Sequence, residues 1–271
     1  YGIERSTSGA SWDYTQIATT SNTTYTDSSL ISGITYYYRV RVVSPGISRY
    51  SNIVNGTTLF NFENALEFDG INNYVSIASD VTVTSNSTIS IWFKPSAVSN
   101  VLVGSSIGGA SLSYILHGNS GSIDVAMVGN SYTFSVVVVL LDVWHNLVLV
   151  RNGTQTRLYI DSVESASGAI TTISTDFSIG LIGKHPTTTI FNMDGVLDEI
   201  AIWGTTTGTA QNAIDLYNGG SGNNSESVIP NPDVHYKLNE SGTETIAVDS
   251  TGNANNGTLT DFPTSGMWVA H

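Results

Sequence analysis

Two separated runs of this sequence, residues 64–75 and 194–203, alternate apolar and polar side chains as a β-strand with one buried face does. Three further runs between them, residues 89–94, 144–150 and 157–161, have the same strand-like character. An apolar face on a strand must pack against a second layer. These five runs therefore favour a fold of packed sheets over a bundle of helices.

The remaining residues agree with an all-β chain. Threonine suits pleated strands, while asparagine and glycine suit tight turns. Asn152-Gly153 lies between two apolar runs and predicts a hairpin. Residues 135–141, the most apolar stretch, predict a strand that is buried on both faces. The best helix candidate is short, residues 209–217, and it ends at an Asn-Gly-Gly stop.

The ordered set of five strand motifs resembles the laminin-G-like, concanavalin A-like jelly-roll family over about residues 62–205. The resemblance implies an antiparallel jelly-roll sandwich. It also implies a binding protein, often for sugars, because members of that family seldom carry out chemistry. We assign residues 60–217 to this jelly roll.

Residues 1–59 resemble the second half of a fibronectin type III domain, so the full fold class is a partial fibronectin type III sandwich followed by a jelly roll. Tyr36 matches that family's tyrosine corner. The resemblance implies that two opening strands are missing from this unit. We expect upstream sequence to supply them, and the alternative is that another chain does. Without them we expect that the unit is not independently stable as given. An apolar face would then be partly exposed, formed by Tyr1, Ile3, Tyr38 and Val40.

The last block, residues 218–271, begins as a Gly/Ser/Asn loop and continues with strand-like segments. It either completes the same jelly roll or begins another repeat. We expect completion, because Trp268 and Val269 form a final apolar strand that needs a partner sheet. The join at residues 59–62 is short, which leaves little room for a flexible linker.

The charge balance narrows the range of partners. The formal net charge is −13, with 9 Lys and Arg against 22 Asp and Glu. Nucleic-acid binding needs clustered cations, so we expect no nucleic-acid partner. We also expect no membrane insertion, because no apolar run is long enough to span a bilayer. No signal peptide is visible at the start, so the sequence neither indicates nor excludes export.

Catalytic constellations are weak, and we expect no enzyme. Asp198 and Glu199 are adjacent, so on a regular strand they point to opposite faces and cannot form a glycosidase pair. The sequence has no Gly-x-Ser-x-Gly elbow and no cysteine nucleophile. The five histidines lack metal-ligand spacing, and His145 reads as a packing residue.

One turn could bind a divalent cation. The run from Asp69 to Asn73 offers the carboxylate and amide oxygens that Ca²⁺ prefers. The family resemblance implies a structural calcium held by Asp69 and Asp198, with Asn72 as a third ligand. The alternative stays open: Asp69 is only a turn residue, and Asp198 only caps a bulge.

Taken together, these features predict a non-enzymatic adhesion or recognition module that binds glycan or a surface protein, located outside the cell, on the cell surface or on a virion. The alternative is a structural spacer or decoration module of a phage appendage or surface filament, in contact with neighbouring subunits. Glycan binding needs an aromatic platform, for which the candidates are Trp12, Tyr14, Tyr132, Trp203 and Trp268.

Overall fold

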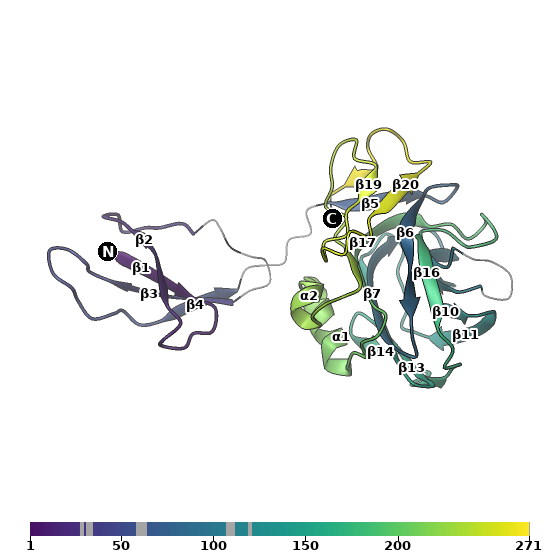
Figure 1. Ribbon diagram of the computed structural model, residues 1–271, viewed down its shortest axis with the longest axis horizontal. Coiled ribbons are helices and arrows are strands. Elements are labelled where there is room, and N and C mark those ends of the chain that lie inside the picture. Colours follow the sequence, from purple (N-terminus) through teal and green to yellow (C-terminus); the bar gives the residue numbers. More distant parts are fainter. Residues whose placement is uncertain (28–29, 31–34, 58–63, 107–111, 119–120, 271) are drawn as a thin grey trace. The chain divides into compact units, whose positions relative to one another are not determined.

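The computed structural model describes residues 1–27, 30, 35–57, 64–106, 112–118 and 121–270. It divides into two compact units, Tyr1–Asn61 and Phe62–His271 (Figure 1). The predicted join at 59–62, with its boundary between residues 59 and 60, lies outside the described residues.

The first unit is a single antiparallel sheet. Its strands are β1 (Gly2–Ser6), β2 (Thr15–Thr19), β3 (Thr35–Arg41) and β4 (Val54–Thr57), in the order β2-β1-β3-β4. Within the described part of this unit, no second sheet covers either face.

Charged and aromatic side chains pack against one another on one face of this sheet. The Arg39 guanidinium lies 4.0 Å from the ring centre of Tyr14 and 3.9 Å from that of Tyr50, and it forms an ion pair with Glu4. The other side carries an open apolar groove of about 710 Å³, whose lining includes Tyr1, Ile3, Tyr38 and Val40. Tyr1 is 47% exposed, whereas Ile3 is buried and the other two side chains are half-buried.

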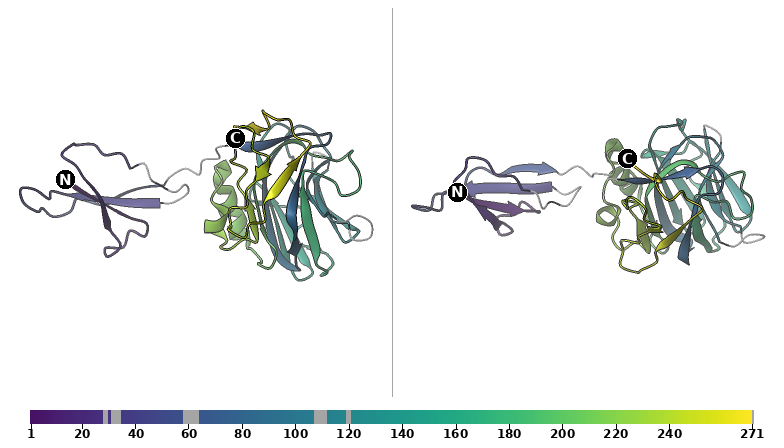
Figure 2. Two further views of the ribbon diagram at one scale, coloured as in Figure 1. Left: turned by 45° about the horizontal axis from the view of Figure 1, so that its top comes forward. Right: turned by 90° about the horizontal axis from the view of Figure 1, so that it is seen from above.

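The second unit is a sandwich of two antiparallel sheets (Figures 1 and 2). The nine-stranded sheet contains β14 (Val163–Glu164), β13 (Gln155–Ile160), β12 (His145–Asn152), β7 (Asn86–Pro95), β17 (Asp194–Trp203), β5 (Ala65–Asp69) and β21 (Trp268–Val269), with β15 (Ile170–Thr171) beside β13 and β18 (Val234–Tyr236) beside β17. The eight-stranded sheet contains β11 (Asn130–Ser135), β10 (Ser122–Met127), β9 (Tyr114–His117), β8 (Asn100–Gly104), β16 (Phe177–Ile182), β6 (Tyr74–Val83), β20 (Gly257–Thr260) and β19 (Ile246–Ala247).

The core of the second unit lies between these sheets. Phe93 of the nine-stranded sheet and Val103 of the eight-stranded sheet belong to one buried cluster, and both are fully buried. The predicted all-β jelly-roll class is therefore confirmed. The cluster draws on strands from Leu66 to Ala247, so segments far apart in sequence share one core.

A short helical segment covers the outer face of the nine-stranded sheet. Helix α1 (Ala210–Tyr217) begins at Thr209, whose side chain accepts a hydrogen bond from the Asn212 amide, and ends at Asn218 in the left-handed conformation. The helix is thus where the sequence predicts it, with the expected stop. It is followed by η2 (Asn218–Gly220) and α2 (Ser225–Val228). None of the helices in the described ranges is long and apolar enough to cross a membrane.

Two predicted pairings are confirmed. The matching alternation of the runs at residues 66–68 and 200–202 predicts that their strands are neighbours, and β5 and β17 do pair, with Leu66 opposite Leu197 and Asp69 opposite Asp194. Residues 200–202 themselves pair with β18. The Asn152-Gly153 hairpin joins β12 to β13, with Asn152 opposite Gln155. The final block also pairs within this sandwich, through β18 on β17, β20 on β6 and β21 on β5.

The apolar run at residues 135–141 differs from its prediction. It was expected to be a strand buried on both faces, but β11 ends at Ser135 and the following residues form a loop. This loop leaves the eight-stranded sheet and reaches β12 in the other sheet, so it cannot pair along its length with either. Of its large apolar side chains, Val139 is buried, whereas Val138 is 61% exposed.

Candidate functional site

The Asp69 turn follows β5 and is organised by the Asp69 carboxylate. Its Oδ1 accepts hydrogen bonds from the backbone N–H groups of Ile71, Asn72 and Asn73, at 2.8, 3.1 and 3.3 Å. Gly70 adopts a φ of +72°, a conformation that glycine allows without strain. All three bonds end on Oδ1, so the turn does not use the second carboxylate oxygen of Asp69.

The turn forms one wall of a pocket of about 520 Å³, which we call the Asp69 pocket. Asp194 lies opposite Asp69 on β17, and its side chain packs against Gly70. Asp261 lies at the end of β20, where its backbone carbonyl accepts a 2.6 Å hydrogen bond from the buried Asn73 side chain. The full lining is Glu67, Phe68, Asp69, Asn73, Asp194, Asp261, Phe262, Pro263, Gly266 and Met267.

Phe262 supplies the aromatic surface of this pocket. It is half-buried and meets the buried Phe68 ring edge-on, with ring centres 5.2 Å apart. Phe262 and Asp261 were not predicted as site residues, because both follow a strand that is far from Asp69 in the sequence. The β20–β6 pairing, which places Thr260 opposite Tyr74, brings them to the turn.

Asp198 does not join Asp69 in this pocket. The register places Asp194 opposite Asp69, and Asp198 lies four residues further along β17, opposite Trp92 of β7. Four residues of extended strand span roughly 13 Å. The predicted pairing of Asp69 with Asp198 as ligands of one ion is therefore corrected. Asn72 is exposed and donates its backbone N–H to Asp69, as a turn residue.

Asp198 instead lies at a β-bulge. The register between β17 and β7 shifts between Asp198 and Ala201, and Glu199 has a φ of +45°. The Asp198 carboxylate accepts a hydrogen bond from the Glu199 amide at 2.8 Å. Asp198 and Glu199 are both fully buried, because both faces of β17 are covered along nearly its whole length. Burial, reinforced by the nearby Glu199 charge, holds the pKa of Asp198 well above its usual range.

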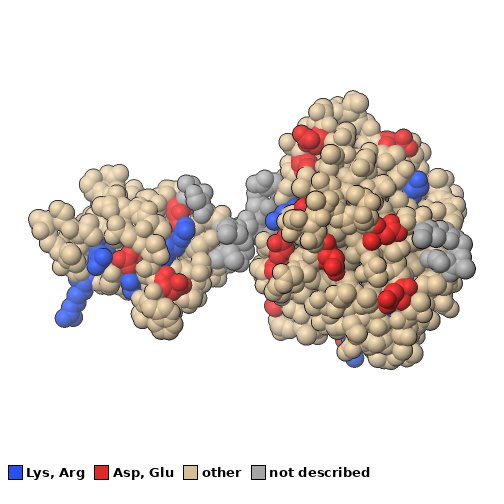
Figure 3. All heavy atoms as spheres, viewed as in Figure 1, with Lys and Arg blue, Asp and Glu red and all other residues tan. Residues whose placement is uncertain are grey.

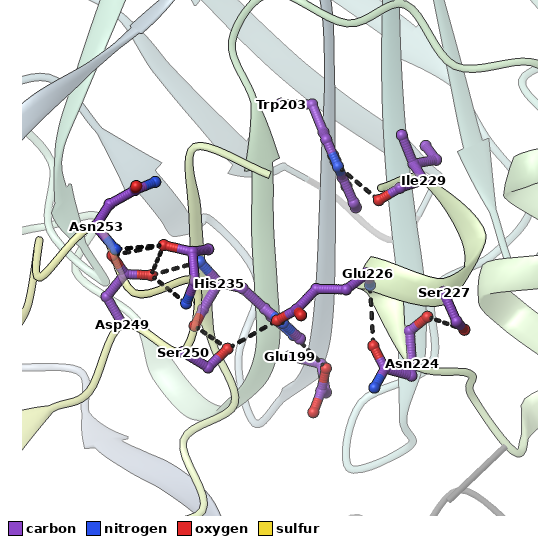
Figure 4. A network of polar contacts seen from close by, with 11 residues as sticks. Glu199, Trp203, Asn224, Glu226, Ser227, Ile229, His235, Asp249, Ser250 and Asn253 are labelled. Atoms are coloured by element: carbon purple, nitrogen blue, oxygen red, sulfur yellow. Dashed lines mark hydrogen bonds and ion pairs between the residues drawn. The ribbon is translucent and has the colours of Figure 1, made fainter. Parts of the chain in front are cut away.

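Glu199 belongs to a buried network centred on His235 (Figure 4). His235 Nε2 lies 2.6 Å from a Glu199 oxygen, and Nδ1 lies 2.9 Å from a Glu226 oxygen, which also accepts from Ser250. Burial alone would lower the pKa of His235, but the hydrogen bonds to the two glutamates outweigh it and raise the pKa. The hydrogen bond from His235 lowers the pKa of Glu226.

This network ties together β17, β18, α2 and the turn at Asp249, as Figure 4 shows. The side chain of His235 is fully enclosed, with 0% exposure, so a dissolved substrate cannot reach it. The network therefore has a structural role, because it fastens the last block of the chain to β17. We call this network the clasp. Sequence analysis missed it because Glu199, Glu226 and His235 carry no recognisable spacing.

The aromatic candidates separate by burial. Trp203 is fully buried and donates its indole N–H to the Ile229 carbonyl, so it cannot serve as a sugar platform. Trp268 and Tyr132 are half-buried, and Tyr14 packs against Arg39. Trp12, in the first unit, is 87% exposed. His145 is buried, as the packing prediction required, with Nδ1 2.7 Å from Asp161.

No group of three or more His, Asp or Glu side chains in the described part of the chain is placed so that it could hold a metal ion. Figure 3 shows that most atoms on the visible face belong to uncharged residues and that the charged side chains lie in small, scattered groups. Neither observation supports a metal centre built from carboxylates alone.

A solved structure with a TM-score above 0.5 independently supports this fold. A Bacteroides ovatus protein named as a candidate carbohydrate-binding protein is 17% identical, with a TM-score of 0.59, over 89% of this chain and 72% of its own. A heptameric SAP-like pentraxin from Limulus polyphemus is 12% identical, with a TM-score of 0.49, over 57% of this chain and 82% of its own. No curated protein sequence matches the chain.

A family model, the laminin-G type domain described as "Concanavalin A-like lectin/glucanases superfamily", matches residues 69–213. The match runs from the Asp69 turn through β17 into α1, and so contains the jelly-roll core. Since it covers more than half of the 271 residues, the chain belongs to the concanavalin A-like lectin/glucanase superfamily.

Proposed function

We propose that this chain is a non-enzymatic carbohydrate-binding module and that it binds glycan at the Asp69 pocket. The observation that carries the proposal is the composition of that pocket. Asp69, Asp194 and Asp261 line it around the half-buried ring of Phe262. No Lys or Arg is among its lining residues.

This arrangement suits the chemistry of a sugar. A pyranose ring has an apolar face that packs on an aromatic side chain, and a rim of hydroxyl groups that donate to carboxylates. Phe262 offers the apolar surface, and Asp194 offers acceptors beside it. Asn73 braces the pocket by bonding the Asp261 carbonyl, which fixes the opposite wall. Because the wall is acidic, we expect neutral glycans to be preferred over anionic ones.

The superfamily supports this reading, because its description names lectins as well as glucanases. The second part of that description also makes hydrolysis the natural rival. Asp69 and Asp194 lie opposite each other in the register of two neighbouring strands, and a pair of carboxylates is what a glycosidase requires. A reducing-sugar assay on the glycans that bind therefore has to accompany the binding experiment.

We still propose that calcium binds at the Asp69 turn, with Asp194 in place of Asp198 as the second carboxylate ligand. Any divalent ion at this turn would use Asp69 and Asp194, because Asp198 is held at the bulge. Two carboxylates alone bind Ca²⁺ weakly, since the ion takes six to eight oxygens. Carbonyl and glycan oxygens would have to complete such a site.

We also propose that residues 1–59 are part of a fibronectin type III-like unit and that the protein works outside the cell, on a cell surface or on a virion. The buried Tyr36 on β3 and the open apolar face of a single sheet support the first statement. Glycan binding supports the second, because polymeric glycans cover such surfaces. Cell fractionation of the native source, probed with an antibody, tests the location.

The test is glycan-array binding followed by titration calorimetry, in calcium and in EDTA. Asp194→Asn and Phe262→Ala should each weaken binding at least tenfold, because each removes one part of the recognition. Glu244→Gln, an exposed carboxylate outside the pocket, is the matched control and should bind as the wild type does.

Three results would contradict parts of the proposal. Binding that survives both pocket substitutions would place the glycan elsewhere. Release of reducing sugar, lost in Asp194→Asn, would make the protein a hydrolase. Glycan binding that is equally strong in calcium and in EDTA would show that the site does not use calcium.

A further inference from the structure

The acidic side chains of the Asp69 pocket form no ion pair with a cation in the described part of the chain. Four of the ten lining residues are acidic, namely Glu67, Asp69, Asp194 and Asp261. Asp194 is half-buried, and the other three are exposed. Their charge therefore has to be balanced by ions from solution or by a ligand.

A lysine at this end of the sandwich does not pair with these carboxylates. The Lys184 ammonium lies over the ring of Tyr74, 3.6 Å from its centre. Tyr74 is the residue of β6 that lies opposite Thr260 of β20. Lys184 does not line the pocket, so the wall that a ligand meets there is acidic and aromatic without a basic side chain.

We propose that the Asp69 pocket selects glycans with free amino groups, such as polymers of glucosamine or galactosamine, over their N-acetylated forms; this rests on the proposed function of the pocket as a glycan site. A free amino group on a sugar is protonated in mildly acidic solution. It therefore brings to the pocket the positive charge that the acidic wall complements. An acetamido group at the same position of the sugar is neutral and gains nothing from that charge.

The spacing of the acidic groups favours a ligand with several amino groups. No three acidic or histidine side chains of the described residues are gathered so that they could hold one metal ion. Asp69 and Asp194 lie opposite each other on β5 and β17, Glu67 lies earlier on β5, and Asp261 follows β20. Charge spread in this way suits cations that are spaced along an oligosaccharide.

The aromatic side chain of the pocket fits the same ligand class. The face of an aromatic ring attracts a cation as well as the apolar face of a sugar. Phe262 is half-buried among the acidic residues, so one ring contributes to both contacts. The pocket volume of about 520 Å³ is within the range of small-ligand sites, roughly 300–1,000 Å³.

The test is titration calorimetry of the intact chain at pH 6 with short oligomers of glucosamine and of galactosamine, each beside the N-acetylated oligomer of the same length. EDTA is present, because calcium would bind the same carboxylates. At least one amino oligomer should bind about tenfold or more tightly than its acetylated form. The preference should shrink in high salt, which screens charge, and at pH 9, where the amine is neutral.

Two substitutions separate the amino preference from glycan binding itself. Glu67→Gln and Asp261→Asn remove charge and keep the shape of the side chain, and asparagine tolerates the φ of +60° at Asp261. The double variant should lose about fivefold or more of the preference and bind acetylated oligomers as the wild type does. Glu67→Gln alone should lose less, and it serves if the double variant is unstable. The control Glu244→Gln, outside the pocket, should keep the full preference.

The outcomes distinguish the amino preference from the glycan site. Equal binding of amino and acetylated oligomers, or binding only of other glycans on the array, would overturn the amino preference; the glycan site stands if that binding is lost in Phe262→Ala. Both proposals are wrong if no glycan binds, or if binding survives Asp194→Asn and Phe262→Ala. A short lysine oligomer that binds as tightly as the amino oligomer would also overturn the amino preference, because the pocket would then recognise charge and not a sugar.

Discussion

The two units of this chain differ in how completely the apolar faces of their sheets are covered. In the second unit, two sheets enclose a shared core, and α1 covers part of the outer face. In the first unit, a single sheet leaves a groove of about 710 Å³ on one side, bordered by Tyr1 and Val40. A sheet with an uncovered apolar face gains little from burial. The comparison implies that the second unit supplies most of the stability and that the first depends on something to cover it.

The largest expected loss of stability comes from a substitution in the enclosed core of the second unit. Phe93→Ala should destabilise the second unit by about 4 kcal/mol, because it removes a fully buried ring between the sheets. Val40→Ala, in the half-buried face of the first unit, should cost about 1 kcal/mol or less. Urea unfolding measures the first change, and amide exchange of β3 measures the second. Equal losses would mean that the two units are equally closed.

The next effect tests the clasp that holds the last block onto the second unit. His235→Ala should cost about 3 kcal/mol, because it leaves Glu199 buried without its partner. His235→Gln, which keeps a hydrogen-bond donor, should cost less. The measurement is urea unfolding at pH 6. A cost near zero for His235→Ala would show that the clasp contributes nothing to the closure of this unit.

The pH dependence of the same clasp has a definite sign. The folded state raises the pKa of His235 above the ordinary 6.5. Its contribution is therefore fully present below pH 6.5 and is lost as the pH rises through the folded-state pKa. His235→Gln should flatten this decline in stability on the alkaline side. An unchanged profile would mean that His235 is not charged between its two glutamates.

A second histidine, His117, should make the stability of the fold depend on pH in the opposite direction. Burial, together with the charge of nearby His145, lowers the pKa of His117 to about 4, and neither ring nitrogen has a hydrogen-bond partner among the residues that the structure describes. The unfolded chain binds this proton more readily, so stability falls as the pH drops from about 6.5 to about 4. His117→Leu should reduce that acid sensitivity. Urea midpoints between pH 7 and 4 that fall as steeply in the variant would contradict the assignment.

The smallest effect concerns the helix on the outer face. Thr209→Ala removes the side chain that caps α1 and should cost about 1 kcal/mol. Thr209→Ser keeps the hydroxyl and is the control. Thermal unfolding of the two variants gives the difference, and no difference would mean that packing of Leu216 alone holds the helix in place.

Local patterns explain which parts of the fold were predictable. The Asn152-Gly153 turn and the Thr209 cap act over a few residues, so the sequence displays them directly. The β5–β17 pairing was predictable because both strands alternate over their length. The loop after Ser135 was not, because aliphatic composition reports hydrophobicity and not which sheet a segment must leave.

The residues of the candidate site also divide into those that a local pattern predicts and those that depend on long-range strand pairing. The oxygen-rich turn at Asp69 was visible in the sequence, but Asp194 was not predicted as a site residue, because only the β5–β17 register places it opposite Asp69. Asp198 lies away from the turn because the β5–β17 register places Asp194 opposite Asp69, and the bulge beside Asp198 then shifts the β17–β7 register by one residue; no pattern in the run reveals either. Asp261 and Phe262 reach the pocket only through the β20–β6 pairing, a long-range contact that one sequence does not display.

The most direct test of the contrast between the units is amide hydrogen exchange on the intact chain at neutral pH. Exchange slows where strands are enclosed on both sides, and it approaches the rate of open chain where a sheet frays. We predict that β3 (Thr35–Arg41) exchanges at least about a hundredfold faster than β7 (Asn86–Pro95), which is buried almost throughout. Equal, slow exchange in β3 and β7 would contradict the account, because it would show that the first unit is as closed as the jelly roll.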